Sequence, residues 1–198
     1  MEALINAGGK GTRMGPCGIE KPMQIIGGKP TVGRVVDAML GASAVDRILV
    51  SVSPNTVKTE EYLKDRGVEV IRTSGEDFMM DMRESFSVLN GEYVMVCPSD
   101  IPLLNSRVVD VCASAFEPSM QSMVVMVDAE RVRSLGIKPS YACEVEGREY
   151  VLSGISVMDR TATINGDYLD EFRLLTDYTE LAVNVNTPGE LELARKMC

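Results

Sequence analysis

Histidine and tryptophan are absent from this chain of 198 residues, and aromatic residues make up only 5% of it. The lack of histidine excludes a Ser-His-Asp triad, a Cys-His dyad and zinc sites that combine cysteine with histidine. No two of the five cysteines have the C-x-x-C spacing of a metal or redox motif. We expect most of these thiols to act as small apolar side chains, with Cys17 as the exception because it lies in a glycine-rich loop.

A basic surface and a long apolar segment are also missing from the sequence. The formal net charge is −9, so no basic stripe is available for the phosphates of a nucleic acid, and we expect no nucleic-acid partner. The apolar runs are far shorter than the roughly 20 residues that a membrane-spanning helix needs. The first residues show no basic segment followed by an apolar run. We therefore expect a cytoplasmic protein without a membrane span or a signal peptide.

What the chain does contain is enough apolar material for a sizeable core. Hydrophobic residues make up 45% of it, and its 13 methionines are typical of side chains that fill irregular gaps in a core. A length of 198 residues fits one large α/β domain better than two small ones. We therefore predict a single domain over residues 1–198.

Runs of β-branched and apolar residues alternate with stretches of helical periodicity, which is typical of βα units and a mostly parallel sheet flanked by helices. Residues 141–159 differ, because they predict short strands around a hairpin turn at Glu146-Gly147. We interpret this region as a small hairpin insertion, a lid or an acceptor-site element, rather than a second domain. The predicted strands are 2–6, 47–52, 68–71, 93–97, 122–127 and 181–185. The predicted helices are 31–40, 57–66, 77–89, 105–116 and 188–196.

The loop after the first strand is the most informative segment, with the sequence Ala-Gly-Gly-Lys-Gly-Thr-Arg-Met-Gly over residues 7–15. Glycines allow backbone N–H groups to converge on phosphate oxygens. Arg13 supplies a fixed fork of donors, and Lys21 supplies a mobile point charge. The spacing is neither that of a Walker A loop nor that of a dinucleotide-binding loop. We predict a nucleotide-binding loop; the alternative is a glycine-rich turn with solvated basic residues.

Polar residues follow two further predicted strands. Asp100 lies at the carboxyl end of a buried strand, where open α/β sheets bind ligands, and one aspartate with one more oxygen ligand suffices for Mg²⁺. Asn184 and Asn186 are two residues apart on a strand, so their side chains share one face. Either amide can ligate Mg²⁺ or donate to a phosphate, and we favour Asn184. The alternatives are an aspartate that caps a turn and, at Asn186-Thr187-Pro188, a simple helix start.

Two more strand ends carry small polar residues, Ser53-Pro54-Asn55-Thr56 and Thr73-Ser74-Gly75-Glu76-Asp77. These segments are also compatible with ordinary turns that cap the next helix. Gly154 interrupts a β-rich stretch, which indicates a close approach of another backbone or of a ligand.

Together, these segments resemble the archaeal GTP:adenosylcobinamide-phosphate guanylyltransferases, which belong to the molybdopterin-guanylyltransferase-like nucleotidyltransferases. The first loop and the Lys21-Pro22 pair are shared by the whole superfamily, whereas the Ser-Pro-Asn-Thr and Thr-Ser-Gly segments narrow the resemblance to this family. The resemblance implies a Rossmann-like nucleotidyltransferase fold, GTP and adenosylcobinamide phosphate as substrates, Mg²⁺ as cofactor and a homodimer.

The resemblance also implies a role for each candidate residue. It assigns catalysis to Arg13, Lys21, Asp100 and Asn184, and it places Mg²⁺ on Asp100 and Asn184. Arg13 is expected at the β- and γ-phosphates and Lys21 at the α-phosphate. Asn6 stands where the family usually has an apolar residue, and it is expected to contact the base or the ribose. The polar segments 53–56 and 73–77, which follow the second and third strands, are expected to contact guanine. The expected nucleotide contacts are Asn6, Ala7, Gly8, Gly9, Lys10, Gly11, Thr12, Arg13, Lys21, Asn55, Thr73, Ser74, Gly154, Asn184 and Asn186.

The implied activity is the transfer of GMP from GTP to the phosphate of adenosylcobinamide phosphate, which yields adenosylcobinamide-GDP and pyrophosphate. A phosphate monoester is already largely dianionic at neutral pH, so the reaction needs no general base, which suits a chain without histidine. Other functions remain open at this point. They are a molybdopterin or 2-phospholactate guanylyltransferase, a sugar-phosphate nucleotidyltransferase and a GTP-binding protein without turnover.

Overall fold

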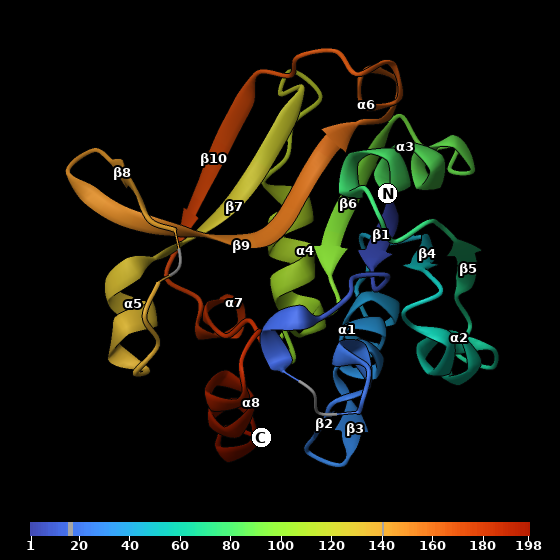
Figure 1. The fold of residues 1–198 in the computed structure, drawn as a ribbon. Coiled ribbons are helices and arrows are strands. Elements are labelled where there is room, and N and C mark those ends of the chain that lie inside the picture. The colour runs from blue at the N-terminus through green and yellow to red at the C-terminus, as the bar shows by residue number, and fades with distance from the viewer. Residues whose placement is uncertain (16–17, 140) are drawn as a thin grey trace.

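A single twisted sheet runs through the computed structural model, which describes residues 1–15, 18–139 and 141–198 (Figure 1). Its strands in the described residues are β1 (Glu2–Asn6), β4 (Arg47–Val52), β5 (Glu69–Arg72), β6 (Tyr93–Pro98), β7 (Ser122–Asp128), β8 (Cys143–Val145), β9 (Arg148–Asp159) and β10 (Glu171–Thr176). Their order is β10-β7-β9-β6-β1-β4-β5, with β8 paired to β9. Strands β5, β4, β1 and β6 are parallel, and so are β7 and β10, whereas β9 is antiparallel to both of its main neighbours. The predicted α/β fold with a mostly parallel sheet is confirmed.

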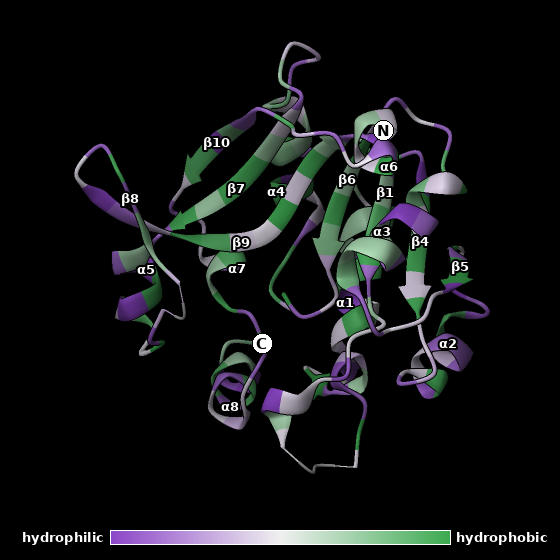
Figure 2. Ribbon diagram, turned by 45° about the horizontal axis from the view of Figure 1, so that its top comes forward, coloured by the Kyte–Doolittle hydropathy of each residue, from purple (hydrophilic) through white to green (hydrophobic). Residues whose placement is uncertain are grey.

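Helices cover both faces of this sheet. They are α1 (Thr31–Leu40), α2 (Val57–Leu63), α3 (Phe78–Ser87), α4 (Ser106–Ser114), α5 (Ala129–Ser134), α6 (Arg160–Asn165), α7 (Thr179–Ala182) and α8 (Pro188–Lys196). Successive residues of β1 alternate between the two layers, because Ala3 and Ile5 pack with α1 and α4 whereas Leu4 packs with Phe86 of α3. A strand that is buried on both faces reads as a continuous apolar run, which explains the green colour of β1 and β6 in Figure 2.

Several predicted elements have the observed bounds, including strands 2–6 and 47–52 and helices 31–40 and 188–196. The predicted strand 181–185 is wrong. Residues Thr179–Ala182 form α7, and the segment after it is extended but belongs to no sheet of the described residues. Val183 and Val185 are nevertheless fully buried, and the Val185 N–H donates to the Asp100 carbonyl. The alternation of apolar and polar residues reflects the burial of Val183 and Val185 with Met14, Ile26 and helix α8 rather than pairing with another strand.

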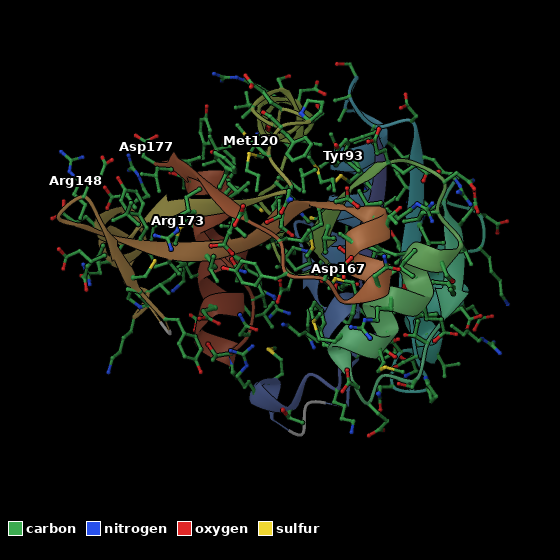
Figure 3. The ribbon with its side chains drawn as sticks, turned by 90° about the horizontal axis from the view of Figure 1, so that it is seen from above. Tyr93, Met120, Arg148, Asp167, Arg173 and Asp177 are labelled. Carbon is green, nitrogen blue, oxygen red and sulfur yellow. The ribbon has the colours of Figure 1, made fainter. Side chains whose placement is uncertain are left out.

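The hairpin predicted at Glu146-Gly147 is present, and both turn residues have positive φ, as a tight two-residue hairpin turn requires. The prediction of short strands is wrong for β9, which has 12 residues and enters the central sheet between β6 and β7. Only the end near β8 projects from the body. In the view from above, Arg148 at this end lies at the far side of the molecule from β4 and β5 (Figure 3). The sequence prediction also missed β10, α5 and α6, as well as the small sheet of β2 (Ile25–Ile26) and β3 (Lys29–Pro30).

The cysteines divide into two groups. Cys97 and Cys112 are buried, as expected for small apolar side chains, and burial raises the pKa of the Cys112 thiol to about 12. Cys143 and Cys198 are exposed, which the sequence did not indicate, and Cys17 lies outside the described residues. In the part of the chain that the structure describes, no helix combines the length and the hydropathy of a membrane span.

Candidate active site

The glycine-rich loop lies at the carboxyl edge of the sheet, between the ends of β4 and β6. The Ala7 N–H donates to the Ser51 carbonyl over 2.9 Å, and the Ser99 N–H donates to the Asn6 carbonyl over 3.2 Å. The chain leaves β1 toward β4 and later returns to β6 on the other side, so this is the switch point at which doubly wound sheets bind ligands (Figure 1). The loop passes close to the end of β4 here, because a Cβ on Gly8 would lie only 3.3 Å from the Cβ of Ser53.

Four of the predicted site residues meet at this edge, although they come from three distant segments. Lys21 Nζ forms an ion pair with Asp100 Oδ2 and donates to Asn186 Oδ1 over 2.8 Å. Arg13 Nη2 donates to the same Asn186 oxygen over 2.7 Å. We call Arg13, Lys21, Asp100 and Asn186 the phosphate cluster. It brings two cations and a carboxylate to the point where the nucleotide loop ends.

Asp100 is the buried member of this cluster, with only 8% of its surface exposed. Its Oδ2 faces Lys21, whereas its Oδ1 is buried and has no hydrogen-bond partner among the described residues. A buried carboxylate oxygen without a partner is costly, and in native proteins such an atom commonly marks a ligand, ion or water. Asp100 therefore has one carboxylate oxygen whose capacity to accept is unused among the described residues.

Asn184 lies beside the cluster and is held by strand β9. Its Nδ2 donates to the Ser153 carbonyl over 3.1 Å, so its nitrogen is occupied by the backbone. Gly154, the residue after Ser153, has φ of +90°, and a Cβ on it would lie 2.8 Å from Pro98 Cγ. Gly154 thus has a close neighbour, but this neighbour is the side-chain ring of Pro98 in β6 and not the backbone or ligand that was predicted. Whether Gly154 also contacts the nucleotide stays a prediction.

Glu20 contributes to the site in a way that the sequence analysis missed. Its carboxylate accepts hydrogen bonds of 2.7 Å from the Lys58 N–H, the Thr59 N–H and the Thr59 hydroxyl at the start of α2. A carboxylate at this place satisfies unpaired N–H groups and suits the positive end of the helix dipole. Because Glu20 precedes Lys21, these bonds fix the backbone that carries the cationic side chain. The partner lies 39 residues away, so no local pattern indicates this contact.

A pocket of about 200 Å³ opens on the other side of the nucleotide loop. Among the predicted nucleotide contacts, Asn6, Gly8, Gly9 and Thr73 line it. Asn55 does not line it but lies directly behind it, since a Cβ on the pocket residue Gly75 would meet Asn55 Nδ2 at 2.7 Å.

Two polar interactions hold the rim of this pocket. Asp81 accepts hydrogen bonds from the N–H groups of Ser74 and Gly75, which shapes the turn after β5. Lys10 forms an exposed ion pair of 2.8 Å with Glu76, which connects the nucleotide loop to the same turn. The pocket therefore lies between the glycine-rich loop and the turn after β5.

Thr187 starts a helix, which is the alternative that the sequence analysis left open for Asn186-Thr187-Pro188. It caps α8, and Glu190 completes the capping box by accepting the N–H groups of Asn186 and Thr187 over 2.8 Å. The helix start and the site are therefore compatible, because the cap fixes the backbone while the Asn186 side chain faces the cations.

Comparison with known proteins gives a match over most of the chain. Residues 3–176 match the family model described as MobA-like NTP transferase domain. An adenosylcobinamide-phosphate guanylyltransferase of Methanocaldococcus jannaschii is 33% identical over 208 residues, which cover 100% of this chain and 97% of that protein. A molybdenum cofactor guanylyltransferase of Histophilus somni is 26% identical over 195 residues, which cover 97% of this chain and 94% of that protein.

Solved structures share the fold at lower sequence identity. A CMP:2-keto-3-deoxy-manno-octonic acid synthetase complexed with CTP has a TM-score of 0.73 at 15% identity, with 99% of this chain and 97% of that chain covered. A nucleotidyl transferase from Methanothermobacter has a TM-score of 0.72 at 15% identity, with 99% and 96% covered. The predicted nucleotidyltransferase fold is confirmed.

Proposed function

Because the chain belongs to the family of MobA-like NTP transferase domains, we propose that it transfers GMP from GTP to the phosphate of adenosylcobinamide phosphate and releases pyrophosphate. The observation that carries this proposal is the phosphate cluster at the end of the nucleotide loop, in a chain that is similar over its full length to an enzyme named for this reaction. The similarity to molybdenum cofactor guanylyltransferases supports the same chemistry with another acceptor.

In this reaction an oxygen of the acceptor phosphate attacks the α-phosphorus of GTP. A new P–O bond forms, the bond between the α-phosphorus and the bridging oxygen breaks, and its electron pair leaves with pyrophosphate. No proton has to be removed from a phosphate dianion, so the absence of histidine is no obstacle. Arg13 and Lys21 neutralise phosphate charge, and the N–H groups of the glycine-rich loop orient the phosphates for in-line attack.

We propose that Mg²⁺ binds at Asp100 through the carboxylate oxygen that has no partner among the described residues. Asn184 would offer its Oδ1, because its Nδ2 is occupied by the Ser153 carbonyl. Both are oxygen ligands, which Mg²⁺ prefers. Asp100 and Asn184 would hold the ion, which would supply positive charge next to the phosphates. Lys21 keeps the other Asp100 oxygen oriented, so one carboxylate serves a side-chain cation and a metal together.

We propose the pocket beside Thr73 as the guanine site, with Asn55 and Ser74 at its edge. A thermal-shift comparison of GTP, ATP, CTP and UTP tests this assignment. A ligand at 100 times its Kd stabilises a protein by about 2.7 kcal/mol, so base selectivity appears directly as a larger shift with GTP. Equal shifts for GTP and ATP would contradict it.

The reaction is tested by measuring pyrophosphate release from GTP with three acceptors, namely adenosylcobinamide phosphate, molybdopterin and 2-phospholactate. Turnover with the first acceptor alone supports the proposal, whereas turnover with one of the others assigns a different guanylyltransferase. Tight GTP binding without pyrophosphate release in any mixture would identify a nucleotide-binding protein without turnover. We also propose a cytoplasmic homodimer, and light scattering on the purified protein measures the dimer directly.

A further inference from the structure

A second pocket, of about 190 Å³, lies on the other side of the phosphate cluster from the guanine site. It is formed by the antiparallel part of the fold, from β7, β9, α5 and α7, which lie together on the side of the hairpin in Figure 1. Arg13 and Asn184 line it as well. The second pocket therefore reaches two of the residues that we assign to the phosphates and the metal.

Much of the lining of this pocket is apolar, and its polar members are Lys138, Tyr141 and Glu190 besides Arg13, Asn184 and Asn186 of the site. Val127, Val132, Val151 and Leu181 form the walls. These side chains come from the apolar stretches of β7 and β9 and from the helices below them (Figure 2). A mostly apolar lining with a few polar groups, among them the cations Arg13 and Lys138, suits a ligand that combines apolar atoms with an anionic group.

Two large apolar side chains stand exposed at the mouth of the same pocket. Leu152 on β9 is 55% exposed and Tyr141 before β8 is 84% exposed, and both line the pocket. Single exposed apolar residues are common and need no explanation. Leu152 and Tyr141, however, both line the same pocket, so together they form an exposed apolar surface beside it, which we call the shelf. The shelf can contact a large apolar group that the pocket itself does not enclose.

We propose that the pocket and this shelf form a two-part acceptor site, an inference that rests on the proposed function. The arm that carries the acceptor phosphate enters the pocket, with the phosphate toward Arg13 and Asn184. The corrin ring stays outside and rests on Leu152 and Tyr141. The volume supports this division, because about 190 Å³ is below the roughly 300–1,000 Å³ of pockets that enclose a drug-sized ligand, and a corrinoid is larger still.

The position of the pocket agrees with the chemistry. The acceptor phosphate has to approach the α-phosphorus from the side opposite the leaving pyrophosphate, so acceptor and nucleotide must enter from different directions. The guanine site belongs to the parallel half of the sheet, and the second pocket belongs to the antiparallel half. Asn184, which we assign to Mg²⁺, lines the second pocket.

The test compares Leu152→Gln with a matched control, Leu40→Gln. Both leucines are about half exposed, and Leu40 ends α1 away from both pockets, so the same change is made on and off the shelf. We expect Leu152→Gln to raise the KM for adenosylcobinamide phosphate about tenfold, the scale of one lost leucine contact. The Kd for GTP should stay within twofold. Leu40→Gln should change neither value.

A second measurement separates the shelf from the pocket. The phosphate arm alone, O-phospho-1-amino-2-propanol, should compete with the corrinoid, and its inhibition constant should be the same in the parent and in Leu152→Gln. Absence of competition, or an inhibition constant that rises with the KM, would overturn the two-part site. So would an unchanged KM in Leu152→Gln. If the parent protein itself released no pyrophosphate with the corrinoid, the proposed function would fail instead.

Discussion

The two edges of the parallel strands carry similar ionic groups that are used differently. At the amino edge, Arg47 forms two hydrogen bonds of 2.7 and 2.6 Å with Glu69 and one of 2.8 Å with Glu2. The second Glu2 oxygen accepts the N–H groups of Asn90 and Gly91 over 2.6 Å. At the carboxyl edge, Lys21 pairs with Asp100, whose second oxygen has no partner among the described residues.

The difference teaches how a structural cluster is told from a functional one in the same sheet. Every carboxylate oxygen of Glu2 and Glu69 has a donor, so the amino edge has no capacity left for a ligand. A buried polar atom without a partner lowers stability, and proteins retain it where a ligand will supply the missing interaction. Substitutions at the carboxyl edge should therefore affect turnover, and those at the amino edge should affect folding.

Asp100→Asn should have the largest effect. It removes the anionic oxygen that we assign to Mg²⁺, so pyrophosphate release should fall about 10³-fold, the scale of several kcal/mol of lost charge stabilisation. Residual activity should need much more Mg²⁺ than the parent does. A Mg²⁺ titration of pyrophosphate release measures both effects. An unchanged Mg²⁺ dependence would place the metal on other residues.

Lys21→Ala should reduce kcat about 10²-fold, because it removes one charged donor from the phosphates while Arg13 and the loop N–H groups remain. Lys29→Ala is the matched control, since Lys29 also forms an ion pair with an aspartate, Asp37, but on the surface of the protein. The control should keep the parent kcat. Equal activity of the two variants would exclude Lys21 from the chemistry.

Glu20→Ala should have an intermediate effect, with kcat lowered about tenfold and the Kd for GTP changed less. The substitution releases the three bonds to α2 and lets the Lys21 backbone move, and small misplacements of a catalytic group are costly. Glu60 lies on α2 and forms an ion pair with Arg72 of β5. Glu60→Ala therefore tests whether the loss of any carboxylate that contacts α2 lowers kcat as Glu20→Ala does. A lower melting temperature with an unchanged kcat would make Glu20 purely structural.

Glu2→Gln should have the smallest effect on turnover, within twofold, and should lower the free energy of unfolding by about 1–3 kcal/mol at pH 7. Burial raises the pKa of the Glu2 carboxyl, but the hydrogen bonds from Gly91 and Asn90 and the Arg47 guanidinium outweigh it, and the pKa lies below its ordinary value of 4.5. The stabilisation is therefore complete above that value and is lost as the pH falls through the lower pKa of the folded state.

Urea unfolding of the parent and of Glu2→Gln between pH 7 and pH 3 checks this prediction. The difference between the two proteins should shrink below pH 4.5, where Glu2 begins to bind a proton in the unfolded chain. A difference that stays constant with pH would mean that the charge of Glu2 contributes nothing. A large loss of turnover in this variant would contradict the division of roles between the edges.

The sequence predicted those parts of the site whose signal is local. The glycine-rich loop, Asp100 at a strand end and the Asn184–Asn186 alternation are each contained within a few residues. The contacts of Glu20 and of Asn184 were beyond prediction, because their partners lie 39 and 31 residues away and are ordinary backbone groups. The error at residues 181–185 has the same cause. An alternation of apolar and polar residues indicates that one side of the segment is buried, but it does not indicate whether a neighbouring strand or other elements cover that side.

The structure places Asn186 in contact with Lys21, which precedes it by 165 residues. During synthesis, the nucleotide loop, Asp100 and the base pocket are all complete long before this partner leaves the ribosome. Its backbone is then fixed by α8, which begins at Pro188 and lies nearly at the end of the chain. A chain that stops before residue 184 would lack both the Asn184 amide that we assign to Mg²⁺ and the Asn186 oxygen that joins Arg13 to Lys21. The phosphate cluster is therefore complete only after residues 184–186 have been synthesised and α8 has fixed their backbone.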